Sequence, residues 1–393
     1  MPFFKDLRLS AVTAGFVAVL VGFTSSVAIV FQAALAFGAT PAQLTSWMWA
    51  LGLGMGLCSA VPSLILKKPV MVAWSTPGAA VLATAGLAGG FSMAEAVGAF
   101  MVCALLIVLA GATGWFERAM NRIPMAIASA LLAGVLARFG LQAFAAAQTD
   151  LTLVLAMLTS YLLSRRLLPR YAVMVTLVVA IAVVALQGRL TLGQVPFALA
   201  RPVFTAPVFT FGALVSLALP LFVVTMASQN LPGVAVMRAT GYMMPVSRLI
   251  TLTGLATLVL APFGGYALNF SAITAAICMG PEAHEDPDKR YTAAVACGFF
   301  YTVLGLFGAV IAGLLTAFPQ ALVVAIAGLA LLGTIGGGLA AALKDEAHRE
   351  AALITFLVTL SGVVIGGIGS AFWGVVAGSV ALFVQQYGAR TTD

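Results

Sequence analysis

Residues 67–80 read Lys-Lys-Pro-Val-Met-Val-Ala-Trp-Ser-Thr-Pro-Gly-Ala-Ala, and they start a helix in the middle of an apolar stretch. Proline disfavours the α region for the residue before it, so Thr76 is expected to be extended. Pro77 suits the first position of a helix, and Ser75 or Thr76 can cap it. From Pro77 to the stop at residues 89–90 the helix is roughly 18 Å long, against a hydrocarbon core of about 30 Å. The sequence therefore predicts half a membrane span that begins near the membrane centre.

The composition excludes a soluble globular chain. Of the 393 residues, 62% are hydrophobic and 8% charged, and the mean hydropathy is +1.11, whereas soluble domains are about 25% charged. We predict an all-α polytopic membrane protein. The net charge of +7 comes from basic residues scattered between apolar spans, which offers no basic face to a nucleic acid. The four cysteines lie in apolar stretches at spacings that match no metal or redox motif, so we expect no metal site, no cofactor and no disulfide.

Windows of about 20 apolar residues predict fourteen transmembrane spans. They lie near residues 11–36, 43–66, 70–88, 95–115, 123–142, 150–165, 171–187, 208–229, 246–263, 266–280, 291–316, 319–340, 350–367 and 370–387.

The basic residues predict the orientation, because cytoplasmic loops are enriched in Lys and Arg. With the N-terminus inside, only Arg138, Arg189 and Arg201 of the 19 basic residues fall outside. We therefore expect cytoplasmic N- and C-termini. The short loops and the absence of organelle-targeting segments favour the inner (cytoplasmic) membrane of a bacterium.

An internal repeat divides the chain. Residues 122–134 resemble residues 317–329 at an offset of 195, and the same offset sets residues 74–80 against 269–275. We expect one repeat over residues 1–190 (spans 1–7) and a second over 205–393 (spans 8–14). Because seven is odd, the second repeat enters the membrane from the opposite side, which makes a 7+7 inverted repeat.

The repeat gives the first half-helix a partner in residues 264–281. This stretch again has an extended approach, a cap candidate at Ser271 and a short helix that ends at Gly280-Pro281. Spans 3 and 10 are thus each predicted to be a short extended segment plus a half-helix, and inversion points the two helix starts at one another. Helix starts carry unpaired N–H groups and partial positive charge, so we expect an anion-binding gap at mid-membrane. The alternative is that each stretch is a kinked span.

Polar and aromatic residues around this gap are the candidate substrate contacts, since polar groups are costly inside membrane spans. A hydroxyl such as Ser25 can equally bond to its own helix, whereas adjacent amides at Gln229 and Asn230 need several partners each. Trp74 and Phe270 flank the helix starts, where they either face a planar ligand or belong to the core. The predicted substrate-binding set is Ser25, Trp74, Ser75, Thr76, Gly78, Gln229, Asn230, Asn269, Phe270 and Ser271.

The acidic residues argue against a cationic substrate. All 12 fall at span ends or in loops, whereas a cation carrier usually keeps a carboxylate at the midplane. If transport is coupled to protons, the coupling group is a rim carboxylate such as Glu95 or Glu282, His284, or the carboxyl group of the substrate. Residues 282–290 contain metal-capable side chains, but this segment is typical of a solvated loop. No Ser/His/Asp or Cys/His set can be placed inside the membrane, so an enzyme is disfavoured.

Residues 69–80, 228–233 and 264–275 resemble the signature stretches of the BenE family of benzoate/proton symporters, and the resemblance covers essentially the whole chain. It implies the uracil-transporter-like fold, with a core domain from residues 9–116 plus 208–316 and a gate domain from 123–187 plus 319–388. Relatives that carry nucleobases place carboxylates on spans eight and ten, where this sequence has Gln229 and Asn269.

The resemblance implies proton-coupled uptake of benzoate or a similar aromatic carboxylate by alternating access between core and gate. The partners are then an aromatic carboxylate, a proton and the lipid bilayer; a homodimer stays open. Two alternatives remain at this point: a carrier of the same fold for another anion or a nucleobase, and an anion channel.

Overall fold

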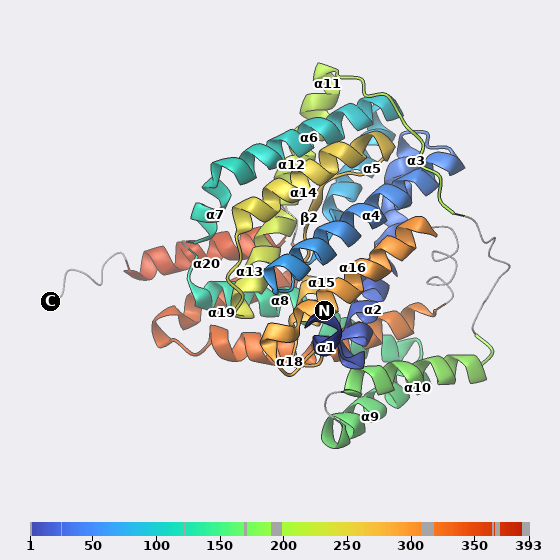
Figure 1. The fold of residues 1–393 in the computed structure, drawn as a ribbon. Coiled ribbons are helices and arrows are strands. Elements are labelled where there is room, and N and C mark those ends of the chain that lie inside the picture. Colours follow the sequence, from blue (N-terminus) through green and yellow to red (C-terminus); the bar gives the residue numbers. More distant parts are fainter. Residues whose placement is uncertain are drawn as a thin grey trace.

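The computed structural model describes residues 2–24, 26–121, 123–168, 171–189, 199–307, 318–363, 365 and 370–386. The described chain is helical except for one two-stranded sheet (Figure 1). The elements of the first half are α1 Pro2–Asp6, α2 Leu9–Thr24, α3 Val27–Ala36, α4 Pro41–Leu66, β1 Val72–Trp74, α5 Thr76–Gly89, α6 Met93–Thr113, α7 Trp115–Met120, α8 Met125–Ala145, α9 Leu151–Leu167 and α10 Ala172–Leu186. Those of the second half are α11 Phe211–Ala213, α12 Leu219–Thr225, α13 Leu231–Ala239, α14 Val246–Leu260, β2 Leu268–Phe270, α15 Ile273–Met279, α16 Tyr291–Leu306, α18 Gln320–Ala342, α19 Arg349–Ser361 and α20 Ser370–Gln386.

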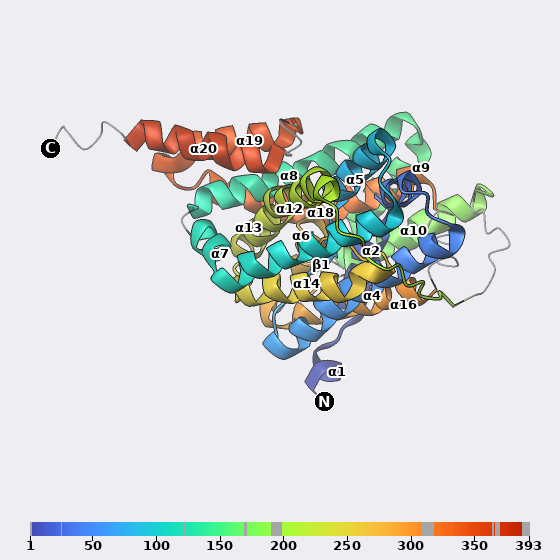
Figure 2. The ribbon, with the colours of Figure 1, turned by 90° about the horizontal axis from the view of Figure 1, so that it is seen from above.

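The helices pack as two groups. In the first, which we name the strand group, α4 packs against α16 and α14, α14 against α6, α16 and α15 against α2, and α5 against α3 and α12. In the second, the α8 group, α8 packs against α18, α19 and α20, and α9 against α10 and α18. Seen from above, α19 and α20 lie together at one side of the molecule next to α8, while α4, α14 and α16 lie on the side nearer to α1 (Figure 2). Helix α13 continues α12 of the strand group. The two groups touch where α13 meets α8 and where α18 meets α2.

The sheet lies inside the strand group. Strands β1 and β2 pair antiparallel, with Val72 opposite Phe270 and Trp74 opposite Leu268. Extended backbone at membrane depth must find hydrogen bonds within the protein. Pairing supplies some of them, and the hydroxyl of Ser59, on α4, accepts a bond of 3.0 Å from the Val72 N–H. On the other strand, the Thr257 hydroxyl of α14 accepts from the Leu268 N–H at 3.0 Å.

Each strand leads into a short helix, as predicted, but the repeat is one residue longer here than the sequence match indicates. Strand β1 begins at residue 72 and β2 at residue 268, so the offset is 196. Trp74 is therefore equivalent to Phe270, and not to Asn269. The two serines make similar bonds: Ser75, the N-cap of α5, accepts the Gly78 N–H at 3.1 Å, and Ser271, one residue before the N-cap Ala272 of α15, accepts the Thr274 N–H at 3.4 Å.

Helix α5 begins one residue earlier than predicted. Thr76 is the first helical residue, and Ser75 is the extended cap, with φ −81° and ψ 98°. The prediction that Thr76 is extended was wrong, because Pro77 occupies the second helical position, where its missing N–H costs nothing.

The predicted eighth span ends too early in the sequence analysis. The helix runs without interruption from Phe211 to Ala239, beyond the predicted end at residue 229. It contains two π-helical turns, η3 (Leu214–Ala218) and η4 (Met226–Asn230). The second residue after each turn is a proline. Proline cannot donate to the carbonyl four residues earlier, and the wider turns before Pro220 and Pro232 accommodate this loss.

Helix length does not by itself give the number of spans. Among the described residues, five helices are long and apolar enough to cross a membrane, or six if the bent pair Gln320–Gly333 and Ile335–Ala342 forms one span. Most of the other predicted spans consist of shorter helices. The predicted first span, for example, is two helices, α2 and α3, separated near Ser26.

Candidate functional site

A cavity of about 410 Å³ lies between the strand group and the α8 group. Its size is in the range of small-molecule sites. The start of α5, the η4–α13 junction and the start of α15 form one wall, and α8, α19 and the start of α20 form the other. The lining residues are Pro77, Val135, Arg138, Phe139, Gln142, Ser228, Gln229, Pro232, Ser271, Ala272, Ile273, Thr359, Gly362 and Ser370.

Two of the predicted substrate contacts line this cavity, Gln229 and Ser271. Gln229 reaches it because the π turn η4 shifts the helix register just before Pro232. Ser271 lies at the end of β2, where the chain turns into α15. Thr76 is half-buried beside the lining residue Pro77. Ser25 lies outside the described residues.

The cap of α5 is buried behind the cavity. The Ser75 Oγ accepts the Gly78 N–H at 3.1 Å and a hydroxyl bond from Thr225 at 3.0 Å. A Cβ on Gly78 would lie 2.6 Å from the Leu221 side chain, so the glycine lets α12 approach α5. Ser75 and Gly78 thus position the helix start, and neither lines the cavity.

The second half-helix is shorter than the first. Helix α15 has 7 residues and α5 has 14. The negative end of a helix this short lies only about 10 Å from its start, so it offsets part of the positive partial charge there. The two half-helices are therefore unequal in length, and α15 offers less positive potential at its start than α5 does.

The two asparagines of the predicted substrate-binding set, Asn230 and Asn269, bond to the backbone at strand β2 and do not line the cavity. Asn230 is fully buried, and its Oδ1 accepts the Phe270 N–H at 3.0 Å while its Nδ2 donates to the Met226 sulfur. Asn269 is also fully buried, and its Nδ2 donates to the Ala267 carbonyl at 2.8 Å. The Asn269 Oδ1 has no hydrogen-bond partner among the described residues.

Of the two alternatives for the aromatic residues beside the helix starts, the structure supports the core. Trp74 is buried, donates to the Ser26 hydroxyl at 2.8 Å and packs against Phe23 with ring centroids 5.8 Å apart. Phe270 is fully buried against Gly233 of α13, whose lack of a side chain makes room for it. Phe139, on α8, is the aromatic side chain that lines the cavity. Sequence analysis missed it because it lies on the opposite wall from the half-helices.

Sequence analysis also missed Arg138. The residue is the one charged side chain of the 21-residue helix α8, and it lines the cavity with Val135, Phe139 and Gln142. Its position inside an apolar helix was the available signal, but the residue was assigned to the outer surface. The guanidinium lies against Gly362, where a Cβ would be 2.6 Å from Nη1. It forms no hydrogen bond or ion pair with another residue in the described ranges.

The three proton-coupling candidates lie away from the cavity lining. Glu95 closes a capping box with Ser92 at the start of α6, and its Oε1 accepts a 3.0 Å bond from the Thr210 hydroxyl. His284 is buried in the loop after α15, and its Nδ1 accepts the Asp286 N–H at 3.0 Å. Burial and the nearby Arg8 cation lower the pKa of His284, so its ring is neutral at pH 7.

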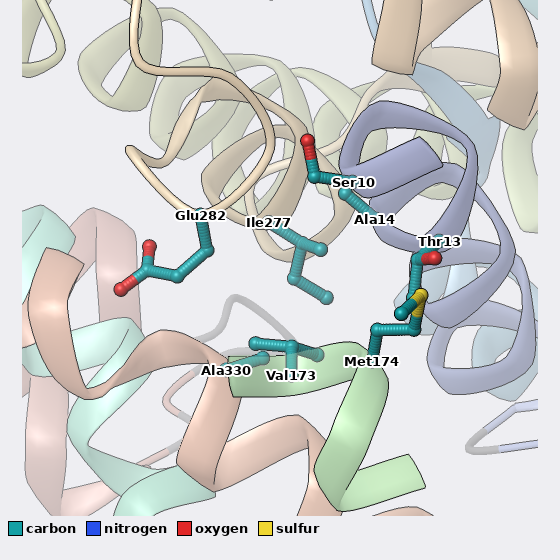
Figure 3. A pocket seen from close by; sticks show the side chains of 8 residues that line it. All are labelled: Ser10, Thr13, Ala14, Val173, Met174, Ile277, Glu282 and Ala330. Carbon is teal, nitrogen blue, oxygen red and sulfur yellow. The ribbon is translucent and has the colours of Figure 1, made fainter. Parts of the chain in front are cut away.

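Glu282 has the most distinctive environment of the three. Its side chain is 10% exposed and accepts a 2.6 Å bond from Arg165 of α9, which also donates to the Tyr161 hydroxyl. It borders a second pocket of about 10 Å³, room for no more than a water molecule. Figure 3 shows Ser10, Ala14 and Ile277 of the strand group above this pocket, and Val173, Met174 and Ala330 of the α8 group below it.

Comparison with known proteins settles the family. The model of the family described as "Benzoate membrane transport protein" matches residues 5–384. This chain belongs to the BenE family. It is 51% identical over 371 residues to the "Inner membrane protein YdcO" of Escherichia coli (strain K12), covering 94% of each chain. It is 40% identical over 380 residues to the "Benzoate membrane transport protein" of Acinetobacter baylyi, covering 97% of this chain and 96% of that protein.

Solved structures of more distant proteins resemble this BenE family member as well. The transmembrane domain of the cyanobacterial bicarbonate transporter BicA has a TM-score of 0.44 at 14% identity and covers 98% of both chains. SLC26A9 has a TM-score of 0.44 at 12% identity, over 93% of this chain and 66% of its own.

Proposed function

We propose that this protein carries benzoate or a similar aromatic carboxylate together with a proton into a bacterial cell, across the inner membrane. The observation that carries the proposal is the composition of the 410 Å³ cavity. One cation, Arg138, two amides, Gln142 and Gln229, and four hydroxyls share it with the apolar surfaces of Val135, Phe139 and Ile273. The hydroxyls are those of Ser228, Ser271, Thr359 and Ser370. An aromatic acid presents a single anionic group on an apolar ring, and these two kinds of surface match its two ends.

We further propose that the strand group is the core domain and the α8 group the gate, as the resemblance implies. The cavity lies at their boundary, where alternating access needs it. At the inner part of the same boundary the Glu282–Arg165 ion pair joins the two groups. The open space beside it is only about 10 Å³. In this arrangement the cavity faces outward and the inner path is shut.

The proposed fourteen spans and cytoplasmic termini receive support from polar contacts between loops. Arg189 pairs with Asp150, and Thr210 bonds to Glu95; the topology places all four of these residues at the outer surface. Other contacts join residues placed at the inner surface. They are Arg165 with Glu282, Arg8 with Glu285, Asp6 with Tyr291, and Glu117 with Ser247.

Uptake into proteoliposomes tests the function. With labelled benzoate outside and an inward proton gradient, we expect saturable uptake that collapses when an uncoupler dissipates the gradient. Excess unlabelled benzoate should compete, whereas uracil, sulfate and bicarbonate should not. Uptake no greater than in empty liposomes, or strong competition by uracil or an inorganic anion, contradicts the substrate. A non-saturating current that is independent of the proton gradient indicates a channel.

A further inference from the structure

Arg138 is a cation inside the membrane for which the described chain provides no counter-ion. A charge within an apolar span is costly, and such residues face the protein interior or a water-filled cavity. Arg138 shares one face of α8 with Val135, Phe139 and Gln142, at helical spacings of three and four residues, and this face lines the cavity. Leu141, on another face of α8, is 61% exposed on the outside of the bundle.

Gly362 sets the position of the guanidinium. It follows α19 with φ +71°, and its missing side chain leaves the space that the guanidinium occupies. A Cβ there would lie 2.6 to 2.8 Å from Nη1, Cζ and Nη2, so the end of the guanidinium lies directly against Gly362. The donor groups of a guanidinium form a fork that fits a carboxylate with two hydrogen bonds.

The polar groups of the cavity come from both helix groups, and Gln142, Thr359 and Ser370 lie in the α8 group with Arg138. Gln229 and Ser271 lie on η4 and at the start of α15, within the strand group, whereas Arg138 lies in the α8 group. We infer that Arg138 binds the carboxylate of the transported acid, and that the bound anion thereby bridges the two helix groups and draws them together. This inference rests on the proposed function, and it assigns to one gate residue both anion selectivity and the coupling of binding to closure.

Binding to the purified full-length protein tests the selectivity. The variant is Arg138→Gln, and its matched control is Arg189→Gln, which removes an arginine that pairs with Asp150 away from the cavity. Isothermal titration with benzoate should show at least about a 10-fold loss of affinity in Arg138→Gln, because the carboxylate loses its charged hydrogen-bond partner. Arg189→Gln should stay within about threefold of the wild type. Arg138→Lys keeps the charge but not the fork, and should lie between wild type and Arg138→Gln.

A neutral ligand separates loss of the ion pair from a damaged cavity. Benzamide has the same ring without the charge, so the wild type should prefer benzoate strongly and Arg138→Gln should bind the two about equally. An Arg138→Gln protein that keeps the preference for benzoate overturns the inference while leaving the proposed function intact. Should Arg138→Gln not fold, Arg138→Lys with an unchanged affinity and preference overturns it. A wild type that binds none of the aromatic acids refutes the proposed function, and the inference with it.

Cysteine labelling tests the bridge. Gln142 lines the cavity, and the four native cysteines are buried, so a Gln142→Cys variant offers an accessible thiol for a maleimide reagent. Saturating benzoate should slow its labelling at least about tenfold when Arg138 is present, because the two groups close. In a Gln142→Cys, Arg138→Gln double variant, also saturated, only the smaller shielding by the ligand should remain. Equal protection in both proteins shows that Arg138 does not couple binding to closure.

Discussion

Arg165 Nη1 lies 2.6 Å from Glu282 Oε1, and this pair joins α9 to the loop that follows α15. Among the ion pairs of the described residues, it is the one that connects the α8 group to the strand group. The opposite side of the boundary holds the 410 Å³ cavity. In the proposed topology the pair lies on the inner side, and it links the two helix groups there.

Removing the charge of Glu282 should loosen the inner side. Arg165 is 45% exposed, so water screens it and the loss of stability should be only about 1 kcal/mol. The larger effect is expected on access: a thiol introduced at Thr13, which lines the small pocket, should react faster in Glu282→Gln than in an otherwise unchanged chain. Glu346→Gln is the control, since Glu346 is 86% exposed in its pair with Arg349. Equal reaction rates in Glu282→Gln and the otherwise unchanged chain show that the Glu282–Arg165 pair does not restrict access to the small pocket.

Gln229 and Asn230 are adjacent amides with different roles. Gln229→Ala should weaken benzoate binding and leave the melting temperature nearly unchanged, because the side chain lines the cavity. Asn230→Ala should cost about 1–3 kcal/mol of stability, since it leaves the buried Phe270 N–H without its acceptor. Titration calorimetry and thermal unfolding in detergent distinguish the two. The reverse pattern, with binding lost in a stable Asn230→Ala protein, contradicts this assignment.

The contact between α13 and β2 requires a glycine. A Cβ at Gly233 would lie 2.4 Å from the Cβ of Phe270 and 3.1 Å from its carbonyl carbon. Phe270 cannot easily move away, because its backbone is part of the paired strand β2. Gly233→Ala should therefore destabilise the protein by about 1–3 kcal/mol. Gly336→Ala is the comparison, because nothing lies within 4 Å of a Cβ there and alanine favours the helix. Thermal unfolding that ranks the two variants equally rules out the close approach.

His284 should make the fold sensitive to mild acid. Its pKa is lowered from the ordinary value of 6.5, first by burial and then by the Arg8 cation; Asp286 opposes this and Lys289 adds to it. The unfolded chain therefore takes up the proton at a higher pH than the folded one, so stability falls as the pH drops below about 6.5. His284→Gln keeps an acceptor for the Asp286 N–H but cannot titrate.

The measurement is the melting temperature at pH 7.5 and at pH 5.5. Wild type should lose more stability than His284→Gln over this interval. Identical losses in the two proteins mean that the histidine is not the sensitive group.

Local sequence rules were sufficient for the elements around the strands. The bonds of Ser75 and Ser271 to the helix starts could be predicted because capping depends on residues within three positions of the helix start. The extended segments before them also follow from local signals. The one-residue error in the repeat, Trp74 against Asn269, arose because the strand register depends on which residues pair across the sheet, and a shift by one turns every side chain to the other face.

The side chains that line the cavity could not be derived in the same way. Asn230, Asn269, Trp74 and Phe270 are all close to the half-helices in sequence, yet they face the strands and helices behind the cavity. Arg138 is far from the half-helices along the chain and completes the cavity.

The local structure of residues 67–80 could thus be predicted from the sequence, because caps, prolines and the length of an apolar run act over a few residues. The amino-acid composition was sufficient to predict a membrane protein. The partner wall of the cavity did not follow from that stretch. It depends on how α8 packs against α13, α19 and α20, a matter of long-range complementarity in which Gly362 makes room for a guanidinium. The tertiary structure therefore decided which polar groups line the cavity, and it placed the Arg138 cation on the wall opposite the helix starts.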